Sequence, residues 1–406
     1  MRYAAPLLLL LGGCEPTVYG TGPEVWSAPT DHADDAWVFD HSRINRLELS
    51  LSPDAEEILR SDRAFSSPKK EVRAQAIFDD EAIGDVGVRL RGRLGSFQGY
   101  DNKPKWQIDF NEFSGERFVG LEAVSLNNAA EDCSMVKEPL AYATYEAVTG
   151  ISSRTGFVQL FVNDADYGLY VLLETQDDRW LDRLEDQGLI GDDSGNLYDG
   201  SYTSASWWPV WVDFGRGRDE LFDLEEGQDI GWADVTNISQ AIEAGDELGP
   251  MSTTLERAVD WDQVLAHLVA DRWLGNDDCY SSGPNNYRVY FEPGAPMIMA
   301  PWDQGGTFNV PPDESRWLNP SNALGGSCRA DPDCAARWDS ARIDLAAHLA
   351  EMDWQGHLED LVELTQEGAD GDPRGQCSVA ERNRARAGLS TWLEVASELV
   401  LVDREN

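Results

Sequence analysis

Acidic and amide side chains gather in two segments of the second half of the sequence. Residues 274–280 have the sequence LGNDDCY, and Asn285 and Asn286 follow. Residues 299–306 have the sequence MAPWDQGG, in which Asp303 comes after a short apolar run. Carboxylate and amide oxygens suit Mg²⁺, and a carboxylate can accept the proton of a substrate hydroxyl. Because acids are abundant in this chain, a calcium-binding or merely solvated turn is the competing interpretation.

Two segments of the first half could bind phosphate. Residues 88–96 (VRLRGRLGS) form a glycine-rich turn after a predicted strand, where backbone N–H groups can approach a phosphate. Lys103 and Lys105 follow, in a chain with five lysines. Glu138, at the start of a predicted helix, could form an ion pair with such a lysine. An ordinary hairpin and a solvated helix-surface carboxylate are the alternatives.

The composition excludes several classes of protein. The chain has 406 residues, with 32 Lys and Arg against 74 Asp and Glu, which gives a net charge of −42. Such a charge repels nucleic acid, so we expect no nucleic-acid partner. Hydrophobic residues make up 42% of the chain, enough for a large core. The histidines lack zinc-site spacing, and no GxSxG motif is present.

The first 14 residues, MRYAAPLLLLLGGC, predict a secretory signal. The segment ends in Leu-Gly-Gly-Cys and resembles a bacterial lipobox. We therefore expect residues 1–13 to be a lipoprotein signal peptide and Cys14 to carry the lipid that anchors the protein to a membrane. Residues 14–35 are expected to form a flexible tether. The predicted location is the bacterial cell envelope, with Glu15 favouring the outer over the inner membrane.

Export would place the remaining cysteines in an oxidising compartment, where disulfides are more common than catalytic cysteines. Cys328 and Cys334 enclose five residues that include Pro332, so we expect them to close a small surface loop through a disulfide. An odd cysteine must remain. The sequence leaves open how the other three pair, namely Cys133, Cys279 and Cys377.

Hydrophobic periodicity predicts an α+β protein with a β-rich lobe over residues 36–175 and a mainly helical lobe over residues 176–406. A cleft between two such lobes is a common ligand site. The expected strands cover residues 46–51, 72–78, 86–91, 106–110, 158–162, 167–173, 287–291 and 297–301. The expected helices cover residues 55–60, 134–148, 233–244, 261–274, 340–351, 354–365 and 378–399. Ser52 is the expected N-cap of the first helix, and Asn163 and Asp164 form the expected turn of a hairpin between strands 158–162 and 167–173.

Seven segments in this order resemble the CotH family, the spore-coat protein H type of atypical kinase. The resemblance runs from about residue 44 to residue 309. It implies a divergent bilobal protein-kinase-like fold, with ATP and Mg²⁺ as cofactors and Mn²⁺ or Ca²⁺ as other candidate ions. The segments are VGVRLRG at 86–92, KPKWQIDF at 103–110, LNN at 126–128, VNDADYGLYVLLE at 162–174, GNLYDG at 195–200, GNDDCY with NNYRVY between 275 and 290, and APWDQGGTF at 300–308.

The resemblance also implies roles for individual residues. Lys103 corresponds to the strand lysine that holds the nucleotide phosphates, and Glu138 to its helix partner. Asp278 corresponds to the catalytic aspartate, with its neighbour Asp277 as the alternative. The other implied positions are Arg91 in the phosphate loop, Glu174 in the cofactor site at the end of the strand that leads into the interlobe hinge, and Asn286 and Asp303 as Mg²⁺ ligands. Period-two geometry places Lys105 on the same sheet face as Lys103, so either lysine could be the phosphate ligand.

One departure from the family pattern leaves two functions open. Family members commonly carry a second acid after the metal-binding aspartate, and this chain has Gly305 there. The first interpretation is a monomeric protein kinase acting on an exported or surface protein rich in Ser and Thr. The second is a non-catalytic surface or adhesion module that binds cations, which the expected extracytoplasmic location and the missing acid both favour.

Overall fold

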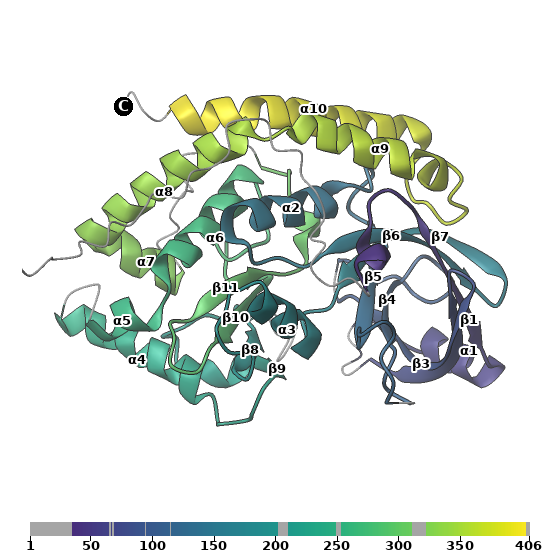
Figure 1. Ribbon diagram of the computed structural model, residues 1–406, viewed down its shortest axis with the longest axis horizontal. Coiled ribbons are helices and arrows are strands. Elements are labelled where there is room, and N and C mark those ends of the chain that lie inside the picture. Colours follow the sequence, from purple (N-terminus) through teal and green to yellow (C-terminus); the bar gives the residue numbers. More distant parts are fainter. Residues whose placement is uncertain are drawn as a thin grey trace, which may run out of the picture.

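The computed structural model describes residues 35–64, 66, 69–93, 95–113, 115–201, 210–248, 253–310 and 322–402. The predicted signal peptide, Cys14 and nearly all of the predicted tether lie outside these ranges. The α+β class expected from the sequence is confirmed, and Figure 1 shows a β-rich half beside a largely helical half. None of the helices in the described ranges combines the length and apolar character needed to cross a bilayer.

The β-rich half is a closed barrel of seven strands. Its order is β1-β2-β3-β4-β5-β7-β6, and β6 closes the barrel by pairing in parallel with β1. Strand β2 alternates exposed and buried residues along its whole length, so one face fills the barrel interior. The strands are β1 (Asn45–Leu51), β2 (Glu71–Phe78), β3 (Glu81–Arg91), β4 (Lys105–Asp109), β5 (Ala123–Asn127), β6 (Thr155–Val162) and β7 (Ala165–Glu174).

Local sequence signals explain the turns of this half. Helix α1 (Pro53–Arg60) begins after Ser52, whose hydroxyl accepts a hydrogen bond from the Ala55 amide, as the sequence predicted. Strands β6 and β7 form the predicted hairpin around Asn163 and Asp164, which both have positive φ. Strand β5 was not predicted, because its five residues are all buried and show no alternation.

The second half contains a four-stranded sheet of order β11-β10-β8-β9 together with most of the helices. The sheet comprises β8 (Asn196–Asp199), β9 (Asp223–Glu226), β10 (Tyr287–Phe291) and β11 (Ile298–Pro301). The longer helices are α2 (Lys137–Thr149), α3 (Asp178–Asp186), α4 (Ala233–Leu248), α5 (Thr253–Ala258), α6 (Trp261–Trp273), α7 (Ala323–Ala330), α8 (Pro332–Glu351), α9 (Trp354–Asp370) and α10 (Val379–Val402). Within the described residues, short 3₁₀ helices cover Ala36–Phe39, Asp219–Leu221 and Gln304–Gly306.

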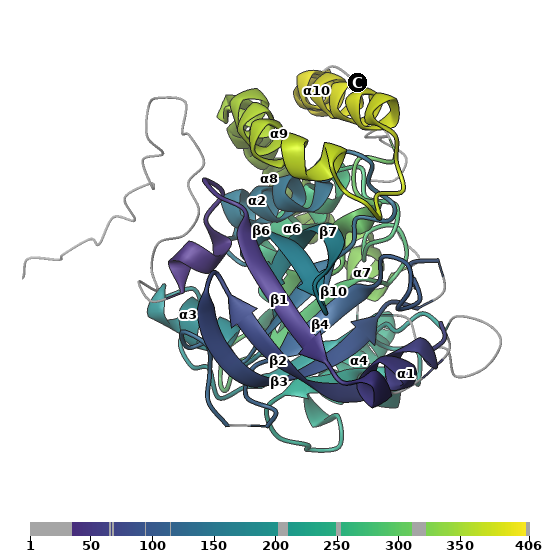
Figure 2. The same ribbon diagram turned by 90° about the vertical axis from the view of Figure 1, so that its right-hand side faces the viewer.

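Helix α2 packs with the helical half, although it precedes two barrel strands in the chain. Its buried residues Leu140 and Tyr145 share one core with Leu265 and Leu268 of α6. The last two helices connect the two halves, because α9 packs on β7 while α10 packs on α6 and α8. In Figures 1 and 2, α9 and α10 lie side by side along one side of the molecule.

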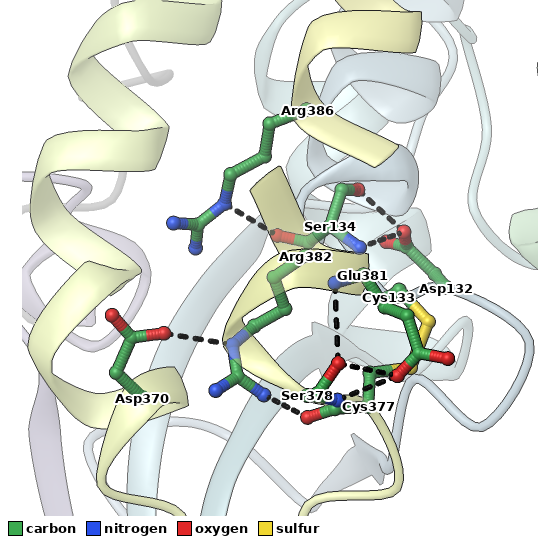
Figure 3. Close-up of a disulfide and its surroundings, with 9 residues drawn as sticks. All are labelled: Asp132, Cys133, Ser134, Asp370, Cys377, Ser378, Glu381, Arg382 and Arg386. Atoms are coloured by element: carbon green, nitrogen blue, oxygen red, sulfur yellow. Dashed lines mark hydrogen bonds and ion pairs between the residues drawn. A yellow bond between two sulfur atoms is a disulfide. The ribbon is translucent and has the colours of Figure 1, made fainter. Parts of the chain in front are cut away.

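The structure contains two disulfides. Cys328 bonds to Cys334, the pairing expected from their spacing. The two cysteines are buried where α7 meets α8, and the residues that they enclose, 329–333, lie at the surface, so the expected surface loop is confirmed. The second disulfide joins Cys133, before α2, to Cys377, before α10, across a sequence separation of 244 residues (Figure 3). Cys279 is a buried free thiol.

Candidate active site

The antiparallel pair β10 and β11 brings two of the predicted metal ligands together. Tyr287 pairs with Pro301, so the residues just outside the pair, Asn286 and Trp302, are also adjacent. The Trp302 amide donates to the Asn286 carbonyl over 3.2 Å. Asn286 and Asp303 both have positive φ, at 50° and 43°. Non-glycine residues seldom adopt this conformation, and it is concentrated at functional sites.

The segment after α6 adds Asp278 to the same place. Its two carboxylate oxygens accept hydrogen bonds from the side-chain amides of Asn285, over 2.6 Å, and Asn286, over 3.0 Å. Asp277 instead accepts from Asn309, so Asp278 is the member of this pair that contacts Asn286. Burial raises the pKa of Asp278 above its usual range, and the negative charge of nearby Asp303 raises it further.

The barrel contributes a lysine and helix α2 contributes a glutamate. The Lys105 ammonium, at the start of β4, lies 3.3 Å from the Asp303 carboxylate, which is 41% exposed. Lys105 and then Arg91 hold the pKa of Asp303 below its usual range. Glu138 is buried in the first turn of α2, and burial raises its pKa to about 7, although nearby Lys105 opposes the shift. Lys105, Glu138 and Gly305 line one pocket.

The structure corrects the expected position of Lys103. Its side chain is 3% exposed and forms an ion pair with Asp372, which is 2% exposed, instead of pointing toward Asp303. The expectation that Lys103 and Lys105 share a sheet face was wrong, because β4 begins only at Lys105. Period-two geometry does not extend to Lys103, which lies before the strand and is followed by Pro104.

Glu174 also differs from its expected use. Glu174 ends β7, as predicted. Its buried carboxylate forms ion pairs with two arginines, Arg154 at 2.7 Å and Arg183 at 2.8 Å. Arg154 also contacts Asp35. These charges lower the pKa of Glu174 to about 2 despite its burial. Glu174 therefore holds buried arginines in place, and its side chain does not face the pocket that Lys105 lines.

Arg91 lies at the end of β3 beside the site. Its guanidinium donates to the Ser125 hydroxyl and lies 4.9 Å from the centre of the Trp302 ring. Arg288 of β10 contacts the same ring at 4.1 Å. Trp302 is thus held between cations of the barrel and of the second sheet, which positions the following residue, Asp303.

A comparison with protein families gives a match that spans the candidate site. A family model described as CotH kinase protein matches residues 88–334, more than half of the chain.

The chain belongs to the CotH kinase family.

The match contains Lys105, Glu138, Asp278, Asn286 and Asp303. Among solved structures, the Helicobacter pylori proinflammatory kinase CtkA is 12% identical, over 85% of this chain and 96% of that chain, with a TM-score of 0.29. A likeness this weak adds nothing to the assignment. No curated protein matches the sequence.

Membership in a kinase family implies ATP and a divalent metal in general terms. We therefore asked whether the side chains at this site could bind such a metal. Within the described ranges, no group of three or more His, Cys, Asp or Glu side chains could hold a metal by itself. Mg²⁺, however, usually takes only one or two carboxylates, and substrate phosphates and waters complete its shell. Asp303 with Asn286 fits that pattern. The site therefore suits a metal that arrives with a nucleotide.

The sequence did not predict the contacts of several residues around the candidate active site. Asn285 and Trp302 lie inside two of the motifs described above. Nothing in the spacing of these motifs indicates that Asn285 contacts Asp278, or that Trp302 contacts Arg91. Ser125, which accepts from Arg91, lay beside the LNN segment. Asp372 lies outside the family match and carried no signal, because its partner Lys103 is 269 residues away in the sequence.

Proposed function

We propose that this chain is an active atypical protein kinase that transfers the γ-phosphoryl group of ATP to a Ser or Thr hydroxyl. The observation that carries the proposal is the 3.3 Å contact between Lys105 and Asp303. It joins a cation of the barrel to the acid that follows β11, close to Asp278 and Asn286. Phosphoryl transfer needs this combination: a phosphate-binding cation, metal ligands, and a carboxylate near the acceptor hydroxyl.

Each residue then has a role. Lys105 binds phosphate oxygens, and Glu138, which lines the same pocket, attracts the Lys105 ammonium electrostatically. Asp303 and Asn286 would hold Mg²⁺, and the ion would supply positive charge to offset the charge of the phosphates. Asp278 accepts the hydroxyl proton while the hydroxyl oxygen forms its bond to the γ-phosphorus and the bond to the β-phosphate oxygen breaks. ADP is the leaving group.

We further propose that the substrate is an exported or surface protein rich in Ser and Thr, and that a lipid on Cys14 anchors the kinase in the cell envelope. The sequence of residues 11–14 supports the anchor. The two disulfides support the compartment, because disulfides persist where the surroundings are oxidising.

Titration with ATP, with and without Mg²⁺, tests the proposed function. We expect Mg²⁺-dependent binding to the purified chain, with a Kd on the order of 1 μM–1 mM, the range typical of enzyme substrates. Calorimetry measures the binding, and mass spectrometry detects phosphate on dephosphorylated casein as a general Ser/Thr acceptor. ATP binding that Mg²⁺ does not change, together with no phosphate transfer, would refute the proposal.

A non-catalytic, cation-binding surface module is the second candidate, and Gly305 is the observation that favours it. The residue lies where family members commonly carry a second acid. A Cβ added there would meet only the Asp303 carboxylate, at 3.9 Å, so an acidic side chain would fit. With one acid in place of two, the site holds its metal less tightly.

Restoring that acid is expected to strengthen the metal site. Gly305→Asp places a second carboxylate beside Asp303, and we expect Mg²⁺-dependent ATP binding to tighten by about tenfold, because hydrogen bonds and contacts with charged groups contribute about 1.5–3 kcal/mol. Gly305→Asn is the matched control of the same size without the charge. If both variants bind Mg·ATP as the wild type does, Gly305 does not adjoin the metal.

A further inference from the structure

The loop between α9 and α10, residues 371–378, is bonded to both sides of the candidate site. Asp372 of this loop forms the buried ion pair with Lys103, two residues before Lys105. Cys377 forms the disulfide with Cys133, five residues before Glu138. The loop lies beyond residue 334, where the match to the CotH family ends.

On the barrel side of this connection, the ion pair between Asp372 and Lys103 is buried. The carboxylate of Asp372 accepts from Lys103 and also from the Leu169 amide of β7, over 3.2 Å. Gly168 must be glycine here, because a Cβ would lie 2.0 Å from the Asp372 carboxylate. Arg374 adds a 2.9 Å bond to the Asp101 carbonyl. The loop is therefore bonded to the segment that leads directly into β4.

The helix side of the connection reaches the first turn of α2. Asp132, next to Cys133, accepts hydrogen bonds from the amides of Ser134, over 2.8 Å, and Lys137, over 2.9 Å. Arg386 of α10 donates to the Ser134 carbonyl over 3.3 Å (Figure 3). The disulfide thus fixes the turn from which α2 starts, and with it the position of Glu138.

We propose that the loop of residues 371–378 is a positioning clamp that sets the placement of Lys105 relative to Glu138, and that the Cys133–Cys377 disulfide makes this placement depend on oxidation. The inference rests on the proposed function of that pair. Lys103, Asp372, Cys133 and Cys377 act through their neighbours and are positioning residues. The clamp engages both partners, because each lies only a few residues from an anchored position.

The oxidation step links the clamp to export. Two thiols, of Cys133 and Cys377, form one S–S bond and give up two electrons and two protons. An exported thiol oxidoreductase in its disulfide form accepts them and becomes a dithiol. In the reducing cytoplasm the bond does not persist, so the kinase reaches full activity only after it leaves that compartment.

The test compares oxidised and reduced wild type with the C133S/C377S variant, each with and without reductant. We expect kcat/KM for Mg·ATP to fall on the order of 10²-fold on reduction, since small misplacements of catalytic groups have effects of that size. The variant should start at the low value and not respond to reductant, which excludes a contribution from Cys328–Cys334. Reduced wild type within twofold of oxidised wild type overturns the proposal.

A second pair of variants tests the ion pair without touching a cysteine. Lys103→Arg keeps the charge opposite Asp372 and should retain kcat, whereas Lys103→Met should lower kcat at a temperature where circular dichroism shows it folded. A purely structural role would lower only the melting temperature of Lys103→Met. Equal kcat for both folded variants therefore contradicts the clamp.

Hydrogen–deuterium exchange provides a readout that needs no activity. Reduction should speed exchange at the amides of Lys137, Leu140 and Ala141 in α2, while the amides of β10 stay protected. If the oxidised wild type binds no Mg·ATP, the proposed function has failed, and the exchange data alone decide whether the clamp holds α2. Unchanged exchange at these amides overturns the clamp even in an active kinase.

Discussion

Lys105→Ala is expected to lower kcat/KM for Mg·ATP by about 10²–10³-fold, the usual effect of removing one preorganised donor to a charged transition state. Lys105 is the cation that contacts Asp303, and in the proposed mechanism its ammonium binds a phosphate oxygen. Steady-state kinetics with varied ATP measures the effect. Lys70→Ala is the matched control, because Lys70 is exposed and contacts Ser61, away from the site.

Substituting Lys103 or Lys105 by alanine should chiefly affect different properties of the protein, namely stability for Lys103 and catalysis for Lys105. Lys103→Ala leaves Asp372 buried without its cation, which costs about 3–5 kcal/mol of stability. Denaturant unfolding should therefore detect Lys103→Ala, and kinetics on the folded variants should show a larger loss of kcat/KM for Lys105→Ala than for Lys103→Ala. Full activity in Lys105→Ala would show that another group binds the phosphates, and the assignment based on the Asp303 contact would then be wrong.

Asp278→Asn is expected to lower turnover by about 10²–10⁴-fold while nucleotide binding changes little, because an amide cannot accept the hydroxyl proton. The substitution keeps the size of the side chain, which contacts Asn285 and Asn286. Single-turnover kinetics measures the transfer step, and calorimetry measures the Kd for Mg·ATP.

Asp303→Asn provides the contrast. It removes the carboxylate that contacts Lys105 and would bind the metal, so the Kd for Mg·ATP should rise. If Asp278→Asn raised the Kd for Mg·ATP as much as Asp303→Asn does, the roles of metal ligand and proton acceptor would have to be exchanged between the two residues. Normal turnover in Asp278→Asn would exclude it as the proton acceptor, and the neighbouring Asp277 would be the next residue to test.

Local patterns in the sequence predicted most of the elements around the site. Apolar residues at period two identified most of the barrel strands, and the order of short motifs identified the CotH family. Ser52 and the Asn163–Asp164 turn were predictable for the same reason, since each acts within a few residues of itself. Asp278, Asn286 and Asp303 were named from the sequence because the short motifs that contain them resemble those of the family, and each lies near the end of an element that the sequence predicts.

Tertiary structure alone decided which side chains meet. Nothing local distinguishes Lys103 from Lys105: the choice depends on where β4 begins and on Asp372, 269 residues away. The partners of Glu174 and the pairing of Cys133 with Cys377 depend in the same way on packing between distant segments. Sequence periodicity shows which face of a helix or strand is buried. The partner of a buried charge or thiol is decided only after the elements have packed, because that packing determines which side chains come within reach.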